Sequence, residues 1–216
     1  MFYPPLREPE EWELISTGNP RPASAVLIPF IREEGEWFIA LEKRTTGISH
    51  PGQFAFPGGH RESTDGSFLQ TALRETTEEM GIPTERITPV GKIGIVVNPG
   101  GRVIHGYGGV FNILSRKELT PSPLEVESIH FISLKSLLVP EAFKTCTLEW
   151  NRNPQKDEGP VSGCFTPKAL EEVSRPLKHE ILFFKAPFGM IWGITGRFLF
   201  MVRSLAAKDS LMSNFS

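Results

Sequence analysis

The sequence contains only two cysteines, Cys146 and Cys164, and they do not form a Cys-x-x-Cys pair. This scarcity argues against a disulfide-stapled secreted fold and against a cysteine-ligated metal site. We expect both to be reduced, partly buried thiols. The amino-terminal residues lack a basic segment followed by an apolar run, so no signal peptide is predicted and a cytoplasmic location is expected.

The chain also lacks a strong excess of charge. Lys and Arg total 23 and Asp and Glu total 25, which gives a net charge of −2. Bulk charge therefore indicates neither nucleic-acid nor membrane-surface binding, and local cations or a metal would have to bind any polyanionic substrate. The most apolar late stretch, residues 183–202, is interrupted by Lys185, Pro187 and Arg197. We expect a buried strand, a turn and a helix there rather than a membrane span.

The length of 216 residues fits one domain with additions. Residues 1–23 are rich in Pro and Glu and are expected to form an amino-terminal extension. Residues 24–216 are expected to form a single domain. Within it, frequent Pro and Gly predict an irregular insertion at about 140–182.

Hydrophobic patterning predicts strands and helices that alternate along the chain. A hairpin is expected from residues 24–31 and 37–44, a loop at 45–57, and further strands at 87–97, 106–114 and 125–133. A short helix is expected to begin at residue 134, and a helix at 192–207 to close the fold. The fold class is therefore α/β or α+β with a mixed sheet.

Residues 68–80 show a helical period, with Ser67 before them and Gly81 after them as capping residues. The apolar face consists of Leu69, Ala72, Leu73, Thr76 and Met80. A neighbouring face presents Glu75, Glu78 and Glu79 within roughly 100° of arc.

These three glutamates repel one another and lie near the helix carboxyl end, where the dipole disfavours anions. Local stability does not explain them, whereas Mg²⁺ commonly binds carboxylates together with phosphate oxygens. The alternative is a solvated acidic face. Gly58 and Gly59, upstream of the helix, allow close backbone approach, and the Gly59 carbonyl could complete a coordination shell. An ordinary tight turn is the alternative for this pair.

The residues Arg74-Glu75-Thr76-Thr77-Glu78-Glu79-Met80-Gly81-Ile82 resemble the signature box of the Nudix hydrolases. Thr76 replaces the usual aliphatic residue. Upstream the chain departs further, because it has His60 and Gly66 where the general box has Gly and Glu. Its loop is one residue longer, and Asp65 is the nearest acid.

This loop length is similar to that of the coenzyme A diphosphatase branch of the family. The resemblance includes Thr71-Ala72-Leu73-Arg74-Glu75 and the upstream pattern Lys43-Arg44-Thr45 followed by residues 50–59, His-Pro-Gly-Gln-Phe-Ala-Phe-Pro-Gly-Gly. It covers residues 24–139 well and is weak from 140 to 182. It implies a mixed sheet sandwiched between helices and Mg²⁺- or Mn²⁺-dependent cleavage of coenzyme A or acyl-coenzyme A to 3′,5′-ADP and 4′-phosphopantetheine.

The resemblance also implies roles for individual residues. Glu75, Glu79 and the Gly59 carbonyl are expected to bind metal, and Glu78 to be a further ligand or a base that holds water. Arg74 is expected to orient Glu75. Glu125 is a candidate extra ligand or general base, with an exposed strand-edge acid as the alternative.

Cations that could bind substrate phosphates are Arg44, His50 and Arg61, together with Lys43 and Arg102. Each could instead be an ordinary surface residue, and Trp37, Trp150 and Trp192 are expected in the core rather than against an adenine. The expected partner is a small nucleotide substrate, not nucleic acid or a membrane, and a homodimer is one assembly that we consider. The alternatives are a Nudix pyrophosphatase for ADP-ribose, a nucleotide sugar or a dinucleotide polyphosphate, and a non-catalytic Nudix-fold binding module.

Overall fold

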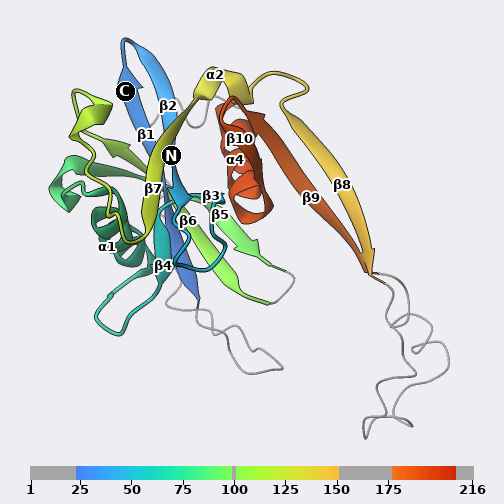
Figure 1. Cartoon of the computed structure of the whole chain (residues 1–216), viewed down its shortest axis with the longest axis horizontal. Helices are drawn as coiled ribbons and strands as arrows, with labels where there is room; N and C mark the ends of the chain where they lie inside the picture. Colours follow the sequence, from blue (N-terminus) through green and yellow to red (C-terminus); the bar gives the residue numbers. More distant parts are fainter. Residues whose placement is uncertain (1–22, 99–100, 151–176, 208–216) are drawn as a thin grey trace, which may run out of the picture.

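A mixed sheet of seven strands lies at the centre of the molecule (Figure 1). The computed structural model describes residues 23–98, 101–150 and 177–207. The strands of the large sheet are β1 (Ser24–Glu33), β2 (Glu36–Arg44), β3 (Phe54–Ala55), β4 (Gly58–His60), β5 (Ile87–Val97), β6 (Val103–Phe111) and β7 (Val126–Ser133). β1 and β6 run parallel, and the other pairs are antiparallel.

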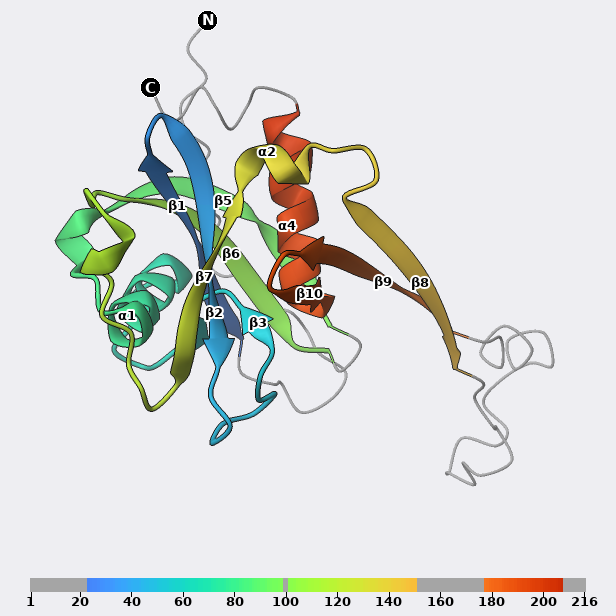
Figure 2. The same ribbon diagram turned by 45° about the horizontal axis from the view of Figure 1, so that its top comes forward.

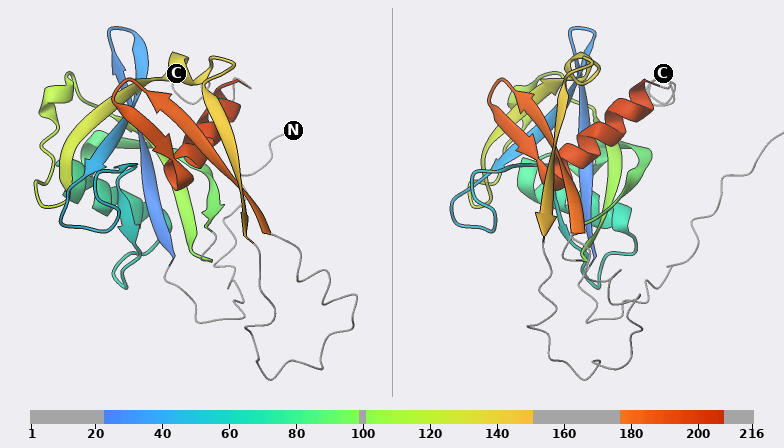
Figure 3. Two further views of the ribbon diagram at one scale, coloured as in Figure 1. Left: turned by 45° about the vertical axis from the view of Figure 1, so that its right-hand side comes forward. Right: turned by 90° about the vertical axis from the view of Figure 1, so that its right-hand side faces the viewer.

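Two helices cover opposite faces of this sheet (Figure 3, left). One is α1 (Phe68–Met80) and the other is α4 (Gly193–Ala206). Successive residues of β1 divide between two cores, because side chains alternate across a strand: Ala25 and Leu27 pack with α1, whereas Ile28 and Phe30 pack with α4. The mixed sheet between helices that the resemblance implies is therefore confirmed.

A second, three-stranded sheet packs on the far side of α4 (Figure 2). It consists of β8 (Phe143–Trp150), β9 (Leu177–Ala186) and β10 (Gly189–Trp192). Phe184 and Ile191 of this sheet join the same core as Phe198 of α4. Short helical segments complete the fold: α2 (Leu134–Leu137) and two 3₁₀ turns at Thr84–Arg86 and Arg116–Glu118. No helix in the described ranges is long and apolar enough to cross a membrane.

The expectation of an irregular insertion at 140–182 is wrong at both ends of that range. Residues 143–150 and 177–186 form β8 and β9, an antiparallel pair in continuous register from Phe143↔Phe184 to Trp150↔Leu177. The prolines and glycines that suggested irregularity lie between these strands, in residues 151–176, which are outside the described ranges together with the 1–22 extension.

The other elements follow the expected pattern with small shifts. The hairpin, the helix at 68–80 and the closing helix are confirmed. The strand expected at 106–114 lies at 103–111, because its register is set by pairing with β5. The loop expected at 45–57 contains β3, and β4 directly follows it.

β1 and β2 separate toward one end of the sheet, and this separation creates the space for the site. Residues 30–33 of β1 pair with β2, but residues 24–26 pair with β4 instead. β3 pairs with β2 at Glu42 and Lys43. The segment from β3 to β4 thus enters between the two diverging strands, and Leu27 N donates to the Pro57 carbonyl at 2.9 Å.

Candidate active site

The Gly58-Gly59 pair forms β4 and allows two close approaches. A Cβ atom on Gly58 would lie 2.2 Å from the Ala25 carbonyl oxygen, and one on Gly59 would lie 2.3 Å from Oε1 of Glu75. Any larger side chain would displace the strand or the carboxylate. The close approach predicted from the two glycines is therefore present, and it brings the first residues of β1 and the α1 carboxylates together.

Helix α1 begins and ends where the sequence predicts. Ser67 is the N-cap and its side chain accepts a hydrogen bond from Gln70 N, while Gly81 ends the helix with φ 67°. Thr76 is fully buried, and its hydroxyl donates to the Ala72 carbonyl at 2.6 Å. This bond explains how the helix accommodates a polar residue at a position that is usually aliphatic.

The three glutamates of α1 differ in their surroundings. Glu79 is buried, and its Oε2 accepts a hydrogen bond from Gly58 N at 2.7 Å. Glu75 is half-buried against Gly59, whereas Glu78 is exposed. Glu75, Glu79 and Gly59 line the cleft described below, but Glu78 does not.

Arg74 links the acids around the site. Its guanidinium donates to Glu75 Oε1 at 3.0 Å, to Glu78 Oε2 at 3.1 Å and to both carboxylate oxygens of Asp65 at 3.1 Å. The contact expected between Arg74 and Glu75 is present, and its role in orienting Glu75 stays a prediction. Glu78 would have to leave Arg74 to act as a ligand or a base.

Asp65 takes the place of the acid that the general box has at position 66. It is buried and also accepts hydrogen bonds from Thr71 Oγ1 and Glu62 N, each at 3.0 Å. The hydrogen bonds from Arg74 lower the pKa of Asp65 to about 2. The longer loop thus still delivers a carboxylate to Arg74, from a position one residue earlier.

Glu42 is a member of the site that the sequence reasoning missed. It lies on β2, is fully buried, and its Oε2 has no hydrogen-bond partner in the described chain. Burial raises the pKa values of both Glu42 and Glu79. Repulsion from Glu42, Glu75 and Glu125 raises the pKa of Glu79 further, whereas the nearby Arg44 partly offsets the rise at Glu42. The available signal was an acid directly after the buried run Ile39-Ala40-Leu41, since buried charges are rare.

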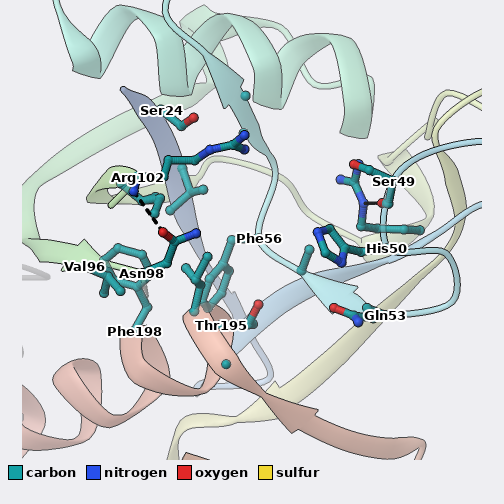
Figure 4. Close-up of a pocket in the computed structure, with 18 of the residues that line it drawn as sticks. Ser24, Ser49, His50, Gln53, Phe56, Val96, Asn98, Arg102, Thr195 and Phe198 are labelled. Atoms are coloured by element: carbon teal, nitrogen blue, oxygen red, sulfur yellow. Dashed lines mark hydrogen bonds between the residues drawn. The ribbon is translucent and has the colours of Figure 1, made fainter. Parts of the chain in front are cut away.

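A cleft of about 980 Å³ lies over these acids (Figure 4). Its polar side includes Arg44, His50, Glu75, Glu79 and Glu125, and its apolar side includes Val96, Ile104, Ile194 and Phe198. Arg44 Nε donates to the Ser49 carbonyl at 3.0 Å, and its Nη1 lies 3.4 Å from Glu42 Oε1. His50 has a positive φ of 57°, in the loop that carries Arg44's partner.

Glu125 reaches the cleft from the start of β7. Its backbone is held by Thr45 N, which donates to the Glu125 carbonyl at 3.0 Å. The preceding loop is tied to the end of α1, because Ser122 N donates to the Glu79 carbonyl. Glu125 is exposed, as its alternative interpretation requires, but it also lines the cleft beside Glu75 and Glu79.

Two of the predicted phosphate-binding cations lie away from the cleft lining. Arg61 donates to the Asp65 carbonyl and lies 5.1 Å above the Phe68 ring. Lys43 forms an ion pair with Glu127 at 2.6 Å. Arg102, by contrast, lines the cleft together with Arg44 and His50.

Two expectations about individual side chains are wrong. Trp192 was expected in the core, but it is 44% exposed and lines the cleft, because it ends β10 at the edge of the cleft. Cys146 was expected to be partly buried but is exposed on β8. The side chains of Trp150 and Cys164 lie outside the described residues.

The acids fit a divalent cation. Glu42 and Glu79 are both buried. A guanidinium nitrogen of Arg44 lies 3.4 Å from Glu42 Oε1, but Glu42 Oε2 has no hydrogen-bond partner, and Glu79 has no ion pair among the described residues. Such a cluster is unfavourable unless a positive charge is supplied. In the described chain no three His, Cys, Asp or Glu side chains are arranged to hold an ion as they stand. These acids would therefore have to move closer together to hold a cation.

Several known proteins are similar to this chain in sequence or in fold. A Photorhabdus laumondii protein named "Uncharacterized Nudix hydrolase NudL" is 27% identical over 172 residues, 80% of this chain and 78% of the relative. An Enterobacter protein of the same name is 44% identical over 71 residues, 33% of this chain and 37% of that relative. In the fold comparison, a MutT/nudix family protein from Enterococcus faecalis has a TM-score of 0.50 at 12% identity, over 94% of this chain and 70% of that one.

The family match covers the part of the chain that carries the site. Residues 21–152, more than half of the sequence, match the NUDIX domain family. These residues include β1 to β7 and α1, and therefore the two glycines, the three helix glutamates, Glu42 and Glu125. The chain therefore belongs to the NUDIX domain family, the family of the Nudix hydrolases.

Proposed function

We propose that this protein hydrolyses a phosphoanhydride bond in a nucleoside diphosphate linked to another group, with coenzyme A or an acyl-coenzyme A as the substrate. The products would be 3′,5′-ADP and 4′-phosphopantetheine or its acyl form. The observation that carries the proposal is the set of buried and half-buried acids beside Gly58 and Gly59 at the base of a cleft that also contains arginines.

The residues of the site would have different roles. Glu75, Glu79 and the Gly59 carbonyl would hold Mg²⁺ or Mn²⁺, with Glu42 behind Glu79. When bound, such an ion neutralises charge that develops on phosphorus and lowers the pKa of nearby water. Arg74 holds Glu75 by the hydrogen bond described above.

Two further residues would act on the substrate and the attacking water. Arg44 faces the cleft and can donate to diphosphate oxygens, since a guanidinium binds phosphate in a fork geometry. Glu125 lies at the cleft surface, where its carboxylate can take a proton from the attacking water.

Coenzyme A is favoured within this class by the residues before the box. The pattern from His50 to Gly59 belongs to the coenzyme A diphosphatase resemblance, and His50, Gln53 and Phe56 of this segment line the cleft. The apolar side of the cleft, which includes Ile194 and Phe198 of α4, offers a surface for the pantetheine arm.

The test is mass-spectrometric product analysis after incubation with Mg²⁺ and a mixture of coenzyme A, ADP-ribose, a nucleotide sugar and a diadenosine polyphosphate. We expect coenzyme A to be consumed first, with the appearance of 3′,5′-ADP. A kcat/KM that favours ADP-ribose over coenzyme A would reject this substrate. Absence of any turnover with tight nucleotide binding would favour a non-catalytic Nudix-fold module.

A further inference from the structure

Arg102 lies in the turn between β5 and β6 and has a fixed backbone. Arg102 N donates to Asn98 Oδ1 at 2.9 Å, and Asn98 N donates to the Arg102 carbonyl at 3.0 Å. Gly101 N also donates to the Asn98 carbonyl at 2.9 Å. Three hydrogen bonds thus hold the turn from which the Arg102 side chain enters the cleft.

The pairing of β4, β1 and β6 shows how far Arg102 lies from the Gly58-Gly59 pair. Ser24 of β1 pairs with His60 of β4 on one side and with Ile104 of β6 on the other. Two strand spacings, about 10 Å, therefore separate β4 from β6. Figure 4 shows the Arg102 side chain extending over the end of β1 beside Ser24, with His50 and Ser49 across the cleft.

One donor of the Arg102 guanidinium has no acceptor in the described protein. Its Nε is buried and has no hydrogen-bond partner there. The other two arginines of the cleft lining already donate to protein oxygens, Arg44 to the Ser49 carbonyl and Arg197 to the Glu180 carbonyl. A buried charged donor without an acceptor is costly, so this position favours an anionic ligand.

We propose that Arg102, with Asn98 and Ser24 beside it, forms a subsite for a phosphate monoester of the substrate, separate from the diphosphate that is cleaved. This deepens the proposed function, on which it rests: in coenzyme A the group is the 3′-phosphate. The diphosphate is expected against Glu75, Glu79 and Gly59, and the spacing of about two strands leaves room for a second phosphate at Arg102. A guanidinium fork matches its oxygens.

The subsite makes the enzyme select coenzyme A over dephospho-coenzyme A, which lacks only that phosphate. We expect the wild-type kcat/KM for coenzyme A to exceed that for dephospho-coenzyme A by about ten- to a hundredfold, the effect of a charged hydrogen bond. Arg102→Gln should bring this ratio close to one by lowering the value for coenzyme A alone. The matched control is Lys92→Gln, which removes one positive charge from an exposed position on β5 and should leave the ratio unchanged.

Two other results would contradict the proposed subsite. If Arg102→Gln lowers both substrates equally, Arg102 binds the diphosphate instead; if the wild type shows no preference, no second phosphate is recognised. The wild-type ratio decides this even where the variant folds poorly.

If the wild type hydrolyses neither substrate, the proposed function fails and equilibrium binding tests the subsite alone. Calorimetry should then show that adenosine 3′,5′-bisphosphate binds more tightly than AMP to the wild type but not to Arg102→Gln. Equal affinities of the wild type for adenosine 3′,5′-bisphosphate and AMP would reject the proposed subsite.

Discussion

Glu79 is the helix carboxylate with the most restricted surroundings, because Gly58 N donates to it and the core encloses it. We expect Glu79→Gln to cut turnover by orders of magnitude, since the neutral side chain cannot supply an anionic ligand. Far-UV circular dichroism should stay unchanged, because the amide oxygen can still accept from Gly58. Near-normal turnover in this variant would contradict the metal-ligand assignment.

Glu42 gives a prediction in which the sign of the effect depends on metal. In metal-free protein at pH 8, Glu42→Gln should raise the free energy of unfolding by about 1–3 kcal/mol. It removes a buried charge of which one oxygen has no partner in the described chain, and this outweighs the loss of the 3.4 Å ion pair with Arg44. With saturating Mg²⁺ the wild type should gain more stability than the variant.

Thermal unfolding with and without Mg²⁺ measures both effects of the Glu42 substitution. The control is Glu127→Gln, an exposed acid that is paired with Lys43 and lies outside the cleft lining. Equal Mg²⁺ responses in the wild type and Glu42→Gln would separate Glu42 from the metal site.

At this scale the sequence identified residues whose spacing within one helix brings them together. Glu75 and Glu79 are four residues apart, so the helical repeat alone predicted a common face. Glu42 depends on tertiary pairing, because the position of β2 relative to α1 cannot be derived from local spacing. Trp192 was misplaced for the same reason, since its exposure depends on where β10 meets the cleft.

Among the elements, α1 depends on the residue that ends it. Gly81 has φ 67°, and a Cβ there would lie 2.1 Å from the Thr120 carbonyl oxygen; Gly35 has φ 80° with nothing within 4 Å. Both Gly→Ala variants should lose about 1 kcal/mol from the left-handed backbone. Gly81→Ala should lose about 1–3 kcal/mol more because of the contact. Urea unfolding measures the difference, and equal losses would show that the loop at Thr120 yields without cost.

The elements that the sequence predicted correctly are those with local signals. α1 has a clear period and caps at both ends, and the β1–β2 hairpin has a turn between two apolar runs. β3 and β4 have two and three residues, and they exist only because distant strands diverge and pair with them. β8 and the first part of β9, residues 177–182, were missed because a long intervening segment separates the paired residues.

For the whole molecule, the buried acids determine how stability depends on pH. Burial raises the pKa values of Glu42 and Glu79 above their unfolded value of about 4.3, so their stabilising contribution is complete below that value and is lost as pH rises. Asp65, whose pKa is lowered to about 2, contributes stability that is lost as pH falls toward that value.

Metal-free protein should therefore be most stable near pH 4 to 5, the window between these opposing changes. Saturating Mg²⁺ should shift the maximum upward, because it stabilises the ionised carboxylates. Denaturant unfolding from pH 3 to 9 measures both curves. A maximum of stability above pH 7 in metal-free protein would show that folding does not raise the pKa values of Glu42 and Glu79.

The fold class was predictable because interleaved strand and helix patterns allow few arrangements. The cleft was not, since its walls come from β1, β4, β5, α1 and α4, and its mouth from the second sheet. No local pattern indicates that these elements meet.

The register of β8 and β9 suggests where the molecule can change in length. Trp150 and Leu177 are paired neighbours, so the chain leaves and re-enters the second sheet at one point. Replacing residues 151–176 with Asn-Gly, which suits a two-residue hairpin, should leave the melting temperature and coenzyme A turnover close to those of the full chain. Lost turnover in a folded variant would assign the deleted residues to the site. Otherwise this junction is a place where evolution can add or remove whole segments, and where a fluorescent reporter or a foreign module can be grafted without touching the catalytic half.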